Sequence, residues 1–277
     1  MSLFLSRFVA YLVLLILTVV SLFAFYILFV NATRGHADIQ KGFSLVPGKF
    51  LVKNFNSMIH SSITPVVSGI INSLLVSSGV AIVACYFSAL TAYALHAYNF
   101  RLRNVAFNFI MVILVIPTQI SASGFVQMMR SIGLTDSFIP LIVPAIASPA
   151  VFFFMKQYME ASLPLEIVEA SRVDGASEFK TFNRIVIPIM KPALAVQAII
   201  TFIGSWNNYF VPALLLESNS KKTMPIVIAQ LRSADFAKFD MGQLYMTIAF
   251  AILPIVVVYF ILSKYIVQGI AMGSVKG

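Results

Sequence analysis

The chain has little charge, and this scarcity excludes most soluble proteins. Only 10% of its 277 residues are charged, whereas 60% are hydrophobic. A soluble globular protein usually carries about 25% charged residues, because its surface must face water. The mean hydropathy of +0.93 points in the same direction. Composition alone therefore favours an integral membrane protein.

Residues that usually carry chemistry are also scarce. The only cysteine, Cys85, excludes a disulfide within the chain and a cysteine-based metal site. The three histidines, His36, His60 and His96, are far apart and share no spacing. We find no acid–base pair, no nucleophile constellation and no G-x-x-x-x-G-K-[ST] phosphate loop. We therefore expect no catalytic residue, no metal site and no cofactor in this chain.

The net charge of +9 comes from 19 Lys and Arg residues, which lie mostly between the apolar runs. This distribution is typical of contact with lipid headgroups at the ends of membrane helices. It does not form the basic cluster that nucleic-acid binding requires.

Six apolar runs are candidates to cross a membrane, because about 20 mostly apolar residues in a helix span about 30 Å of hydrocarbon. They are residues 8–30, 68–95, 105–128, 138–155, 192–211 and 244–267. The runs lack the alternation of barrel strands, and membrane helices tolerate their internal prolines. The first run is too long for the apolar core of a signal peptide, so we expect a retained anchor. The sequence thus predicts an all-α integral membrane protein with six transmembrane helices in a single domain, 1–277.

Charge does not orient these helices. Six spans place both termini on one side with the loops 96–104 and 156–191. The loops 31–67, 129–137 and 212–243 lie on the other. The two sides carry ten and nine Lys and Arg residues respectively, a difference too small for the positive-inside rule.

One polar segment interrupts the apolar pattern, "EASRVDGASEFKTFNRIVIPIMKP" at 169–192. Ser162 and Pro164 predict the start of a helix before it, Gly175 predicts a turn, and Ser177 predicts a second cap. We expect a helix–turn–helix outside the bilayer. Its several acids disfavour an anionic lipid surface, so a protein partner fits better.

This segment resembles the EAA loop of permease subunits in binding-protein-dependent ABC importers, with the pattern E-A-A-x-x-D-G-A. The match is Glu169-Ala170-Ser171 and Asp174-Gly175-Ala176, with Ser171 as a mild departure. Further resemblances are "SWNNYFVPALLL" at 205–216, "TMPIVIAQL" at 223–231 and the tail "YIVQGIAMGSVKG" at 265–277. Within the carbohydrate group, the chain is most similar to the smaller, maltose-permease-type partner with six spans.

The resemblance implies the type I ABC importer permease fold and ATP-driven import of a sugar or oligosaccharide by alternating access. Both termini and the loop 156–191 would be cytoplasmic, in a bacterial cell membrane. The implied partners are a second homologous permease, two ATPase subunits that bind ATP and magnesium, and an extracytoplasmic sugar-binding protein.

The resemblance also implies two ATPase contacts. The coupling helix would contain Glu169, Ala170, Ser171, Arg172, Asp174, Gly175 and Ala176. The tail residues Gly273, Ser274, Val275, Lys276 and Gly277 would run between the ATPase subunits.

Polar residues within the apolar runs are candidates for the substrate pathway. The amides that stand out are Asn72, Gln119, Gln197, Asn207 and Asn208. Because amides and aromatic rings suit sugars, the selected candidates are Gln119, Gln197, Trp206, Asn207 and Tyr209. Hydrogen bonding between helices is an alternative role for each of them. In maltose-type importers the larger partner supplies the sugar site, which counts against direct contact here.

Two other functions remain open. The same architecture could import another solute, such as a polyamine or a phosphorylated polyol. A secondary transporter would carry acids within its spans and show inverted repeats, whereas the six runs contain no Asp or Glu.

Overall fold

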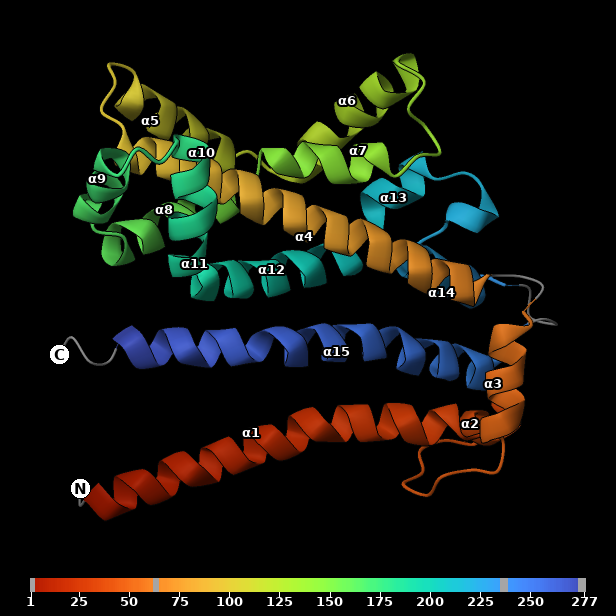
Figure 1. Ribbon diagram of the computed structural model, residues 1–277. Coiled ribbons are helices and arrows are strands. Elements are labelled where there is room, and N and C mark those ends of the chain that lie inside the picture. The colour runs from red at the N-terminus through yellow and green to blue at the C-terminus, as the bar shows by residue number, and fades with distance from the viewer. Residues whose placement is uncertain (1–2, 62–64, 235–238, 274–277) are drawn as a thin grey trace. The chain divides into compact units, whose positions relative to one another are not determined.

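The computed structural model describes residues 3–61, 65–234 and 239–273. Over these residues the chain forms helices and no strand, which confirms the all-α expectation (Figure 1). The chain divides into two compact units, Met1–Val67 with Val227–Leu253 and Ser68–Ile226 with Pro254–Gly277. We describe each unit by itself.

The first unit is built on one long apolar helix and the loop that follows it. Its helices are α1 (Leu3–Ala32), α2 (His36–Gln40) and α3 (Leu51–Ile59), with most of α14 (Met224–Arg232) and the first part of α15 (Met241–Gly273).

The second unit holds most of the remaining elements. They are α4 (Val66–Ala97), α5 (Arg103–Leu114), α6 (Thr118–Ser131), α7 (Ile139–Ile142), η1 (Val143–Ile146), α8 (Pro149–Ser162), α9 (Leu165–Val173), α10 (Glu178–Thr181), η2 (Phe182–Val186), α11 (Ile187–Ile189), α12 (Lys191–Trp206), α13 (Phe210–Leu215) and η3 (Asn219–Lys221). The segment η2 is a turn of π-helix between α10 and α11.

Small residues on α4 organise the core of this unit. Ala84, Ala89 and Ala92 are fully buried in one cluster with Met155 of α8 and Phe182 of η2. Alanine lets helices approach closely, and in a bilayer close packing replaces the hydrophobic effect as the main attraction between helices. The inner face of α4 therefore fixes the position of the loop that follows α8.

Prolines interrupt the α-helical geometry of two predicted runs, although Ile139–Ser162 remains one candidate span. The run 105–128 becomes α5 and α6, because Pro117 occupies the position before α6 and disfavours helical geometry at the residue preceding it. The run 138–155 becomes α7, η1 and α8, with Pro144 in η1 and Pro149 at the start of α8. Pro254, in contrast, lies inside the uninterrupted α15.

Four helices among the described residues are long and apolar enough to cross a membrane: Leu5–Ala32, Val66–Ala97, Ile139–Ser162 and Met241–Tyr265. A fifth span results if Glu178–Ile189 and Lys191–Trp206, which meet at 79°, are counted together, and Arg103–Leu114 is a shorter apolar helix. The count of six spans stays a prediction.

Buried polar groups fix the loop after α1. Arg34 is buried, and its Nη1 donates to Asn31 Oδ1 at 3.0 Å. Asn54 of α3 is also buried and donates from Nδ2 to Ala32 O at 2.8 Å and to Arg34 O at 2.9 Å. The bond to Ala32 O satisfies a carbonyl that the end of α1 would otherwise leave unpaired, and the bond to Arg34 O does the same for the chain that follows.

Gly242→Ala should destabilise the first unit. A Cβ at this position would lie 2.7 Å from Arg34 O and from the Asn54 amide, so we expect a loss of about 1–3 kcal/mol from overpacking. Gly124→Ala, in the open surface of α6, is the matched control and should be neutral or stabilising by about 0.5–1 kcal/mol. Thermal unfolding of the purified protein measures both. Equal midpoints for the two variants would contradict the packing argument.

Candidate functional site

The polar segment folds as a helical hairpin of α9 and α10, joined at Gly175. Gly175 has φ +77°. Its N–H donates to Arg172 O at 3.0 Å, and the Ala176 N–H donates to Ser171 O at 3.1 Å. This pair of bonds is the Schellman motif, which favours glycine in the left-handed position. The predicted helix–turn–helix is confirmed.

The two predicted helix starts have different outcomes. Ser177 is the N-cap of α10, and its Oγ accepts a bond from the Lys180 N–H at 3.4 Å, as expected. Ser162 was predicted to cap α9, and this is wrong, because α8 continues through Ser162. Pro164 occupies the N-cap of α9 without a side-chain bond.

The hairpin presents an apolar and acidic surface. Glu169, Ala170, Asp174 and Gly175 are exposed. Between them Val173 is 87% exposed, and Phe179 on α10 is 71% exposed. Large exposed apolar side chains on a polar loop are typical of a protein–protein contact.

Two residues of the same motif face inward instead. Ser171 is buried and shares a hydrogen bond with Thr181 Oγ1 at 2.6 Å. The Arg172 guanidinium lies over the Tyr98 ring at 5.1 Å, and its Nε donates to Glu178 Oε1 at 2.7 Å. These two side chains connect α9 to α10 and thereby hold the hairpin together.

The hairpin is bound directly to α4. Tyr93, buried near the end of α4, donates from its hydroxyl to Glu178 Oε2 at 2.8 Å. Tyr93, Tyr98, Arg172 and Glu178 thus form one connected group, hereafter the Glu178 cluster. It joins a helix of the membrane core to both helices of the hairpin.

Acid should loosen this cluster. The bond from Arg172 is the main cause that lowers the pKa of Glu178 to about 2, against partial burial that raises it. A lowered pKa stabilises the folded state above the unfolded value of about 4.3, and this stabilisation is lost as the pH falls towards 2. We expect thermal stability to show this loss between about pH 4.5 and 2. Glu178→Gln should lack that component, and identical pH profiles for the two proteins would contradict the assignment.

A cavity of about 620 Å³ lies elsewhere in the second unit. Its walls come from α4, the end of α5, α6, the α7–η1–α8 segment, the end of α12 and the chain around α13. The described residues that line it are uncharged, and its polar lining consists of Ser73, Ser77, Ser121, Ser148, Ser205, Asn208 and Thr223. The hydroxyls of Ser77 and Thr223 are buried without a hydrogen-bond partner. The volume lies within the range of about 300–1,000 Å³ that is usual for small-molecule pockets.

Four of the predicted pathway residues, Gln197, Trp206, Asn207 and Tyr209, are not among the described residues that line this cavity. Trp206 is buried and stacks on Phe202, with ring centroids 5.6 Å apart. Gln197 is buried, and Asn207 and Tyr209 are exposed. The Gln119 side chain falls outside the described residues. Asn208 of the lining is one of the amides that stand out in the sequence, whereas Ser205 was missed, because a serine in an apolar run has no distinguishing pattern.

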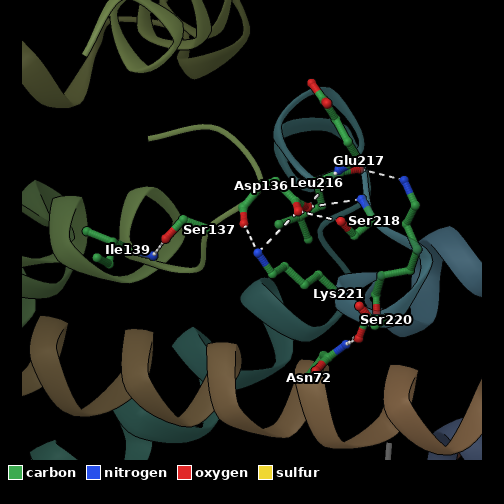
Figure 2. A network of polar contacts seen from close by, with 10 residues as sticks. Asn72, Asp136, Ser137, Ile139, Leu216, Glu217, Ser218, Ser220 and Lys221 are labelled. Atoms are coloured by element: carbon green, nitrogen blue, oxygen red, sulfur yellow. Dashed lines mark hydrogen bonds and ion pairs between the residues drawn. The ribbon is translucent and has the colours of Figure 1, made fainter. Parts of the chain in front are cut away.

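Asp136 organises a second polar network (Figure 2). Its Oδ1 accepts bonds from the Glu217 and Ser218 N–H groups, both at 3.0 Å, and its Oδ2 accepts from Ser218 Oγ at 2.5 Å. Lys221 pairs with the same carboxylate at 3.1 Å. Asp136 has φ +51°, a conformation that Asp tolerates better than most residues. No pattern in the sequence indicated this residue.

The network continues to α4 through Asn72. Its Nδ2 donates to Ser220 O at 2.8 Å and to Lys222 O at 3.0 Å (Figure 2). Two loops and the start of α4 are thereby fixed to one another. Asn72 serves hydrogen bonding within the protein, the alternative considered for intramembrane amides.

Asp136→Ala should expose this loop to trypsin after Lys221 and Lys222. The alanine lacks every acceptor and is strained at positive φ. Asp136→Asn tolerates the backbone and keeps an acceptor but loses the ion pair, so its cleavage rate should be intermediate. Bonds from Ser218, with Lys221, hold the pKa of Asp136 well below its usual range. Equal cleavage of all three proteins would contradict this role.

Two predicted features lie at the limits of the structure. Gly273 is the last residue of α15, and Ser274, Val275, Lys276 and Gly277 fall outside the described residues. Within the described parts of the chain, no group of three His, Cys, Asp or Glu side chains is placed to hold a metal ion.

Four helices of membrane length among the described residues, together with a polar helical hairpin, define a polytopic helical membrane protein. Residues 84–272 match the family model described as "Binding-protein-dependent transport system inner membrane component". The chain belongs to this family of transport permeases, as the resemblance predicted.

Named relatives agree. The chain is 34% identical to the arabinooligosaccharide transport system permease protein AraQ of Bacillus subtilis, over 74% of this chain and 72% of that protein. It is 30% identical to the sn-glycerol-3-phosphate transport system permease protein UgpE of Yersinia pestis, over 90% of each. A bacterial ABC transporter chain from the crystal structure of an importer of the acidic polysaccharide alginate has the same fold, with a TM-score of 0.82. It is 21% identical, and the match covers 94% of this chain and 96% of that one.

Proposed function

We propose that this permease passes a neutral sugar or oligosaccharide, which an extracytoplasmic binding protein delivers. The cavity supports this choice of cargo. Six of its seven polar lining residues bear a hydroxyl group, and the seventh, Asn208, bears an amide. Hydroxyls and amides bind sugar hydroxyls as both donors and acceptors. The prolines and aliphatic side chains of the wall suit the apolar faces of a sugar ring. The 34% identity to an arabinooligosaccharide permease supports the same class.

The unpartnered hydroxyls of Ser77 and Thr223 support solute contact. A buried hydroxyl without a partner costs about 1–3 kcal/mol. Rotation about χ1 would let each hydroxyl turn toward a solute in the cavity, and a sugar hydroxyl would then supply the missing bond.

ATP hydrolysis would reach this chain through the α9–α10 hairpin. Val173 and Phe179 would enter an apolar groove of a cytoplasmic ATPase subunit, while Glu169 and Asp174 pair with its basic groups. The loop 156–191 and both termini would be cytoplasmic. A second homologous permease and two ATPase subunits complete the assembly, ATP and magnesium belong to the ATPase, and the tail 273–277 contacts it.

A phosphorylated polyol is the second candidate cargo, since the glycerol-3-phosphate permease matches 90% of the chain. An anionic solute usually requires Lys, Arg or a helix N-terminus as a partner. The second permease subunit would have to supply that partner, because the lining residues of this cavity are uncharged.

Uptake into proteoliposomes tests the cargo. The co-purified complex, with its binding protein, should import neutral oligosaccharide in preference to glycerol phosphate. Ser77→Ala combined with Thr223→Val should lower uptake, whereas Ser123→Ala, exposed on α6 and outside the cavity lining, should not. Import of only the anionic solute would overturn the proposal, and failure of the chain to co-purify with an ATPase would overturn the assembly.

A further inference from the structure

The loop between α2 and α3 is held rigidly at both of its ends. Arg34 Nη2 donates to Gly42 O at 2.9 Å. The Gly48 N–H donates to Thr33 Oγ1 at 2.8 Å, and the Phe50 N–H donates to Thr33 O at 2.9 Å. A Cβ at Gly48 would lie 2.5 Å from Thr33 O, so glycine is required there. Residues 43–47, hereafter the tip loop, are thereby presented as a fixed shape.

The tip loop turns back alongside α1 (Figure 1). Tyr26 donates from its hydroxyl to Leu45 O at 2.6 Å. The Phe23 and Phe43 rings lie 6.1 Å apart. Both α1 residues belong to the candidate span Leu5–Ala32. They precede its last residue by nine and six positions, which corresponds to about 9–14 Å along the helix axis.

The surface of the tip loop is apolar with basic flanks. Phe43 is 68% exposed, Leu45 50% and Val46 71%. Lys41 and Lys49 are exposed on either side of it, and Lys41 also makes an exposed ion pair with Asp38 at 3.3 Å. Apolar residues between lysines are typical of segments at the boundary between acyl chains and anionic headgroups.

Hydrogen bonds to the loop's own backbone lower the free-energy cost of moving the loop from water into the membrane. Ser44 Oγ accepts a bond from the Val46 N–H at 3.0 Å, and Tyr26 satisfies Leu45 O. An unsatisfied backbone group would cost several kcal/mol in a medium without water. The buried guanidinium of Arg34 donates hydrogen bonds to the Asn31 side chain and to the carbonyls of Asp38 and Gly42. These bonds fix the base of the loop.

We propose that the tip loop is a lipid anchor. Phe43, Leu45 and Val46 enter the headgroup–acyl boundary beside α1, and Lys41 and Lys49 contact lipid phosphates. The direction of the loop decides the partner. A soluble binding protein approaches beyond the end of α1, whereas the tip loop points back along the span. The inference does not depend on the cargo or on which side of the membrane the loop lies.

Spin-label accessibility in nanodiscs of phosphatidylcholine and phosphatidylglycerol tests the anchor on the assembled complex. In a Cys85→Ala background, labels at Phe43→Cys and Val46→Cys should collide with oxygen and lose collision with an aqueous nickel chelate. Lys49→Cys should retain the nickel collision. Preferential nickel access at the tip would overturn the anchor, and protection from both probes would assign the tip to a protein partner instead.

A second pair of variants addresses the placement of the loop. Tyr26→Phe removes the bond to Leu45 O, so the label at Val46 should shift toward nickel access. Tyr11→Phe removes a hydroxyl from an exposed position earlier in α1 and should change nothing. An unchanged signal in Tyr26→Phe would contradict the proposed seat beside α1.

Discussion

Gly175→Arg should reduce ATP-driven transport by more than about tenfold, which corresponds to about 1.4 kcal/mol of lost coupling. The arginine at φ +77° strains the turn, and its long charged side chain projects from the exposed end of the hairpin. The Cβ itself meets no neighbour within 4 Å, so the chain should still fold and insert.

Gly133→Arg is a close control. Gly133 has φ +70° and also meets no neighbour within 4 Å. It ends α6 with the same motif, since its N–H donates to Arg130 O at 3.2 Å and the Leu134 N–H donates to Met129 O at 2.9 Å. Both variants bear a similar backbone cost of about 1 kcal/mol. Only the position on the proposed ATPase contact differs.

Transport per ATP hydrolysed in proteoliposomes measures this prediction, with co-purification of the ATPase as the check on assembly. Gly133→Arg should transport normally, while Gly175→Arg should lose coupling or lose the ATPase from the complex. Equal transport by the two variants would remove the hairpin from the proposed contact.

Tyr93→Phe should lower the number of solute molecules imported per ATP hydrolysed. The substitution removes the bond by which the hairpin holds α4, while the ion pair between Arg172 and Glu178 remains. A bond to a charged acceptor contributes about 1.5–3 kcal/mol. This value is an upper bound here, because the Glu178 side chain is 42% exposed. We expect the hairpin to move in response to ATP while α4 follows it incompletely.

Tyr86→Phe provides the comparison on the same helix. Tyr86 donates from its hydroxyl to Asn183 Oδ1 at 3.2 Å, outside the Glu178 cluster. A general loss of stability would lower ATPase activity and transport together in both variants. A decrease in the transport-to-ATPase ratio for Tyr93→Phe alone supports transmission through the cluster, and an unchanged ratio rejects it.

The sequence predicted the helical class and the hairpin well, because both depend on short-range rules. Long apolar runs require helices in a membrane, and Asp174-Gly175 permits the left-handed turn. Ser162 was misassigned, since a favourable cap cannot be distinguished from the last turn of a helix that extends past the apolar run. Pro117 broke a predicted span, whereas Pro254 did not, and a single sequence holds no rule that separates the two.

The contacts of Asp136 and Glu178 could not have been predicted. Asp136 meets Ser218 across 82 positions, and Tyr93 meets Glu178 across 85. Such pairs depend on how helices pack, which a single sequence does not encode locally. The cavity could not be predicted for the same reason. The sequence around its serines does not differ from the sequence around serines that pack elsewhere in an apolar run.

The π-turn at η2 affects the direction in which α11 and α12 leave the hairpin. A π-turn accommodates one more residue than an α-turn, and each residue rotates a helix by about 100°. Deleting one residue from Phe182–Val186 would regularise the coil yet swing the face of α12 that carries Ser205 away from its present direction. The one additional residue in this turn therefore sets the angle between the hairpin and the part of α12 that lines the cavity.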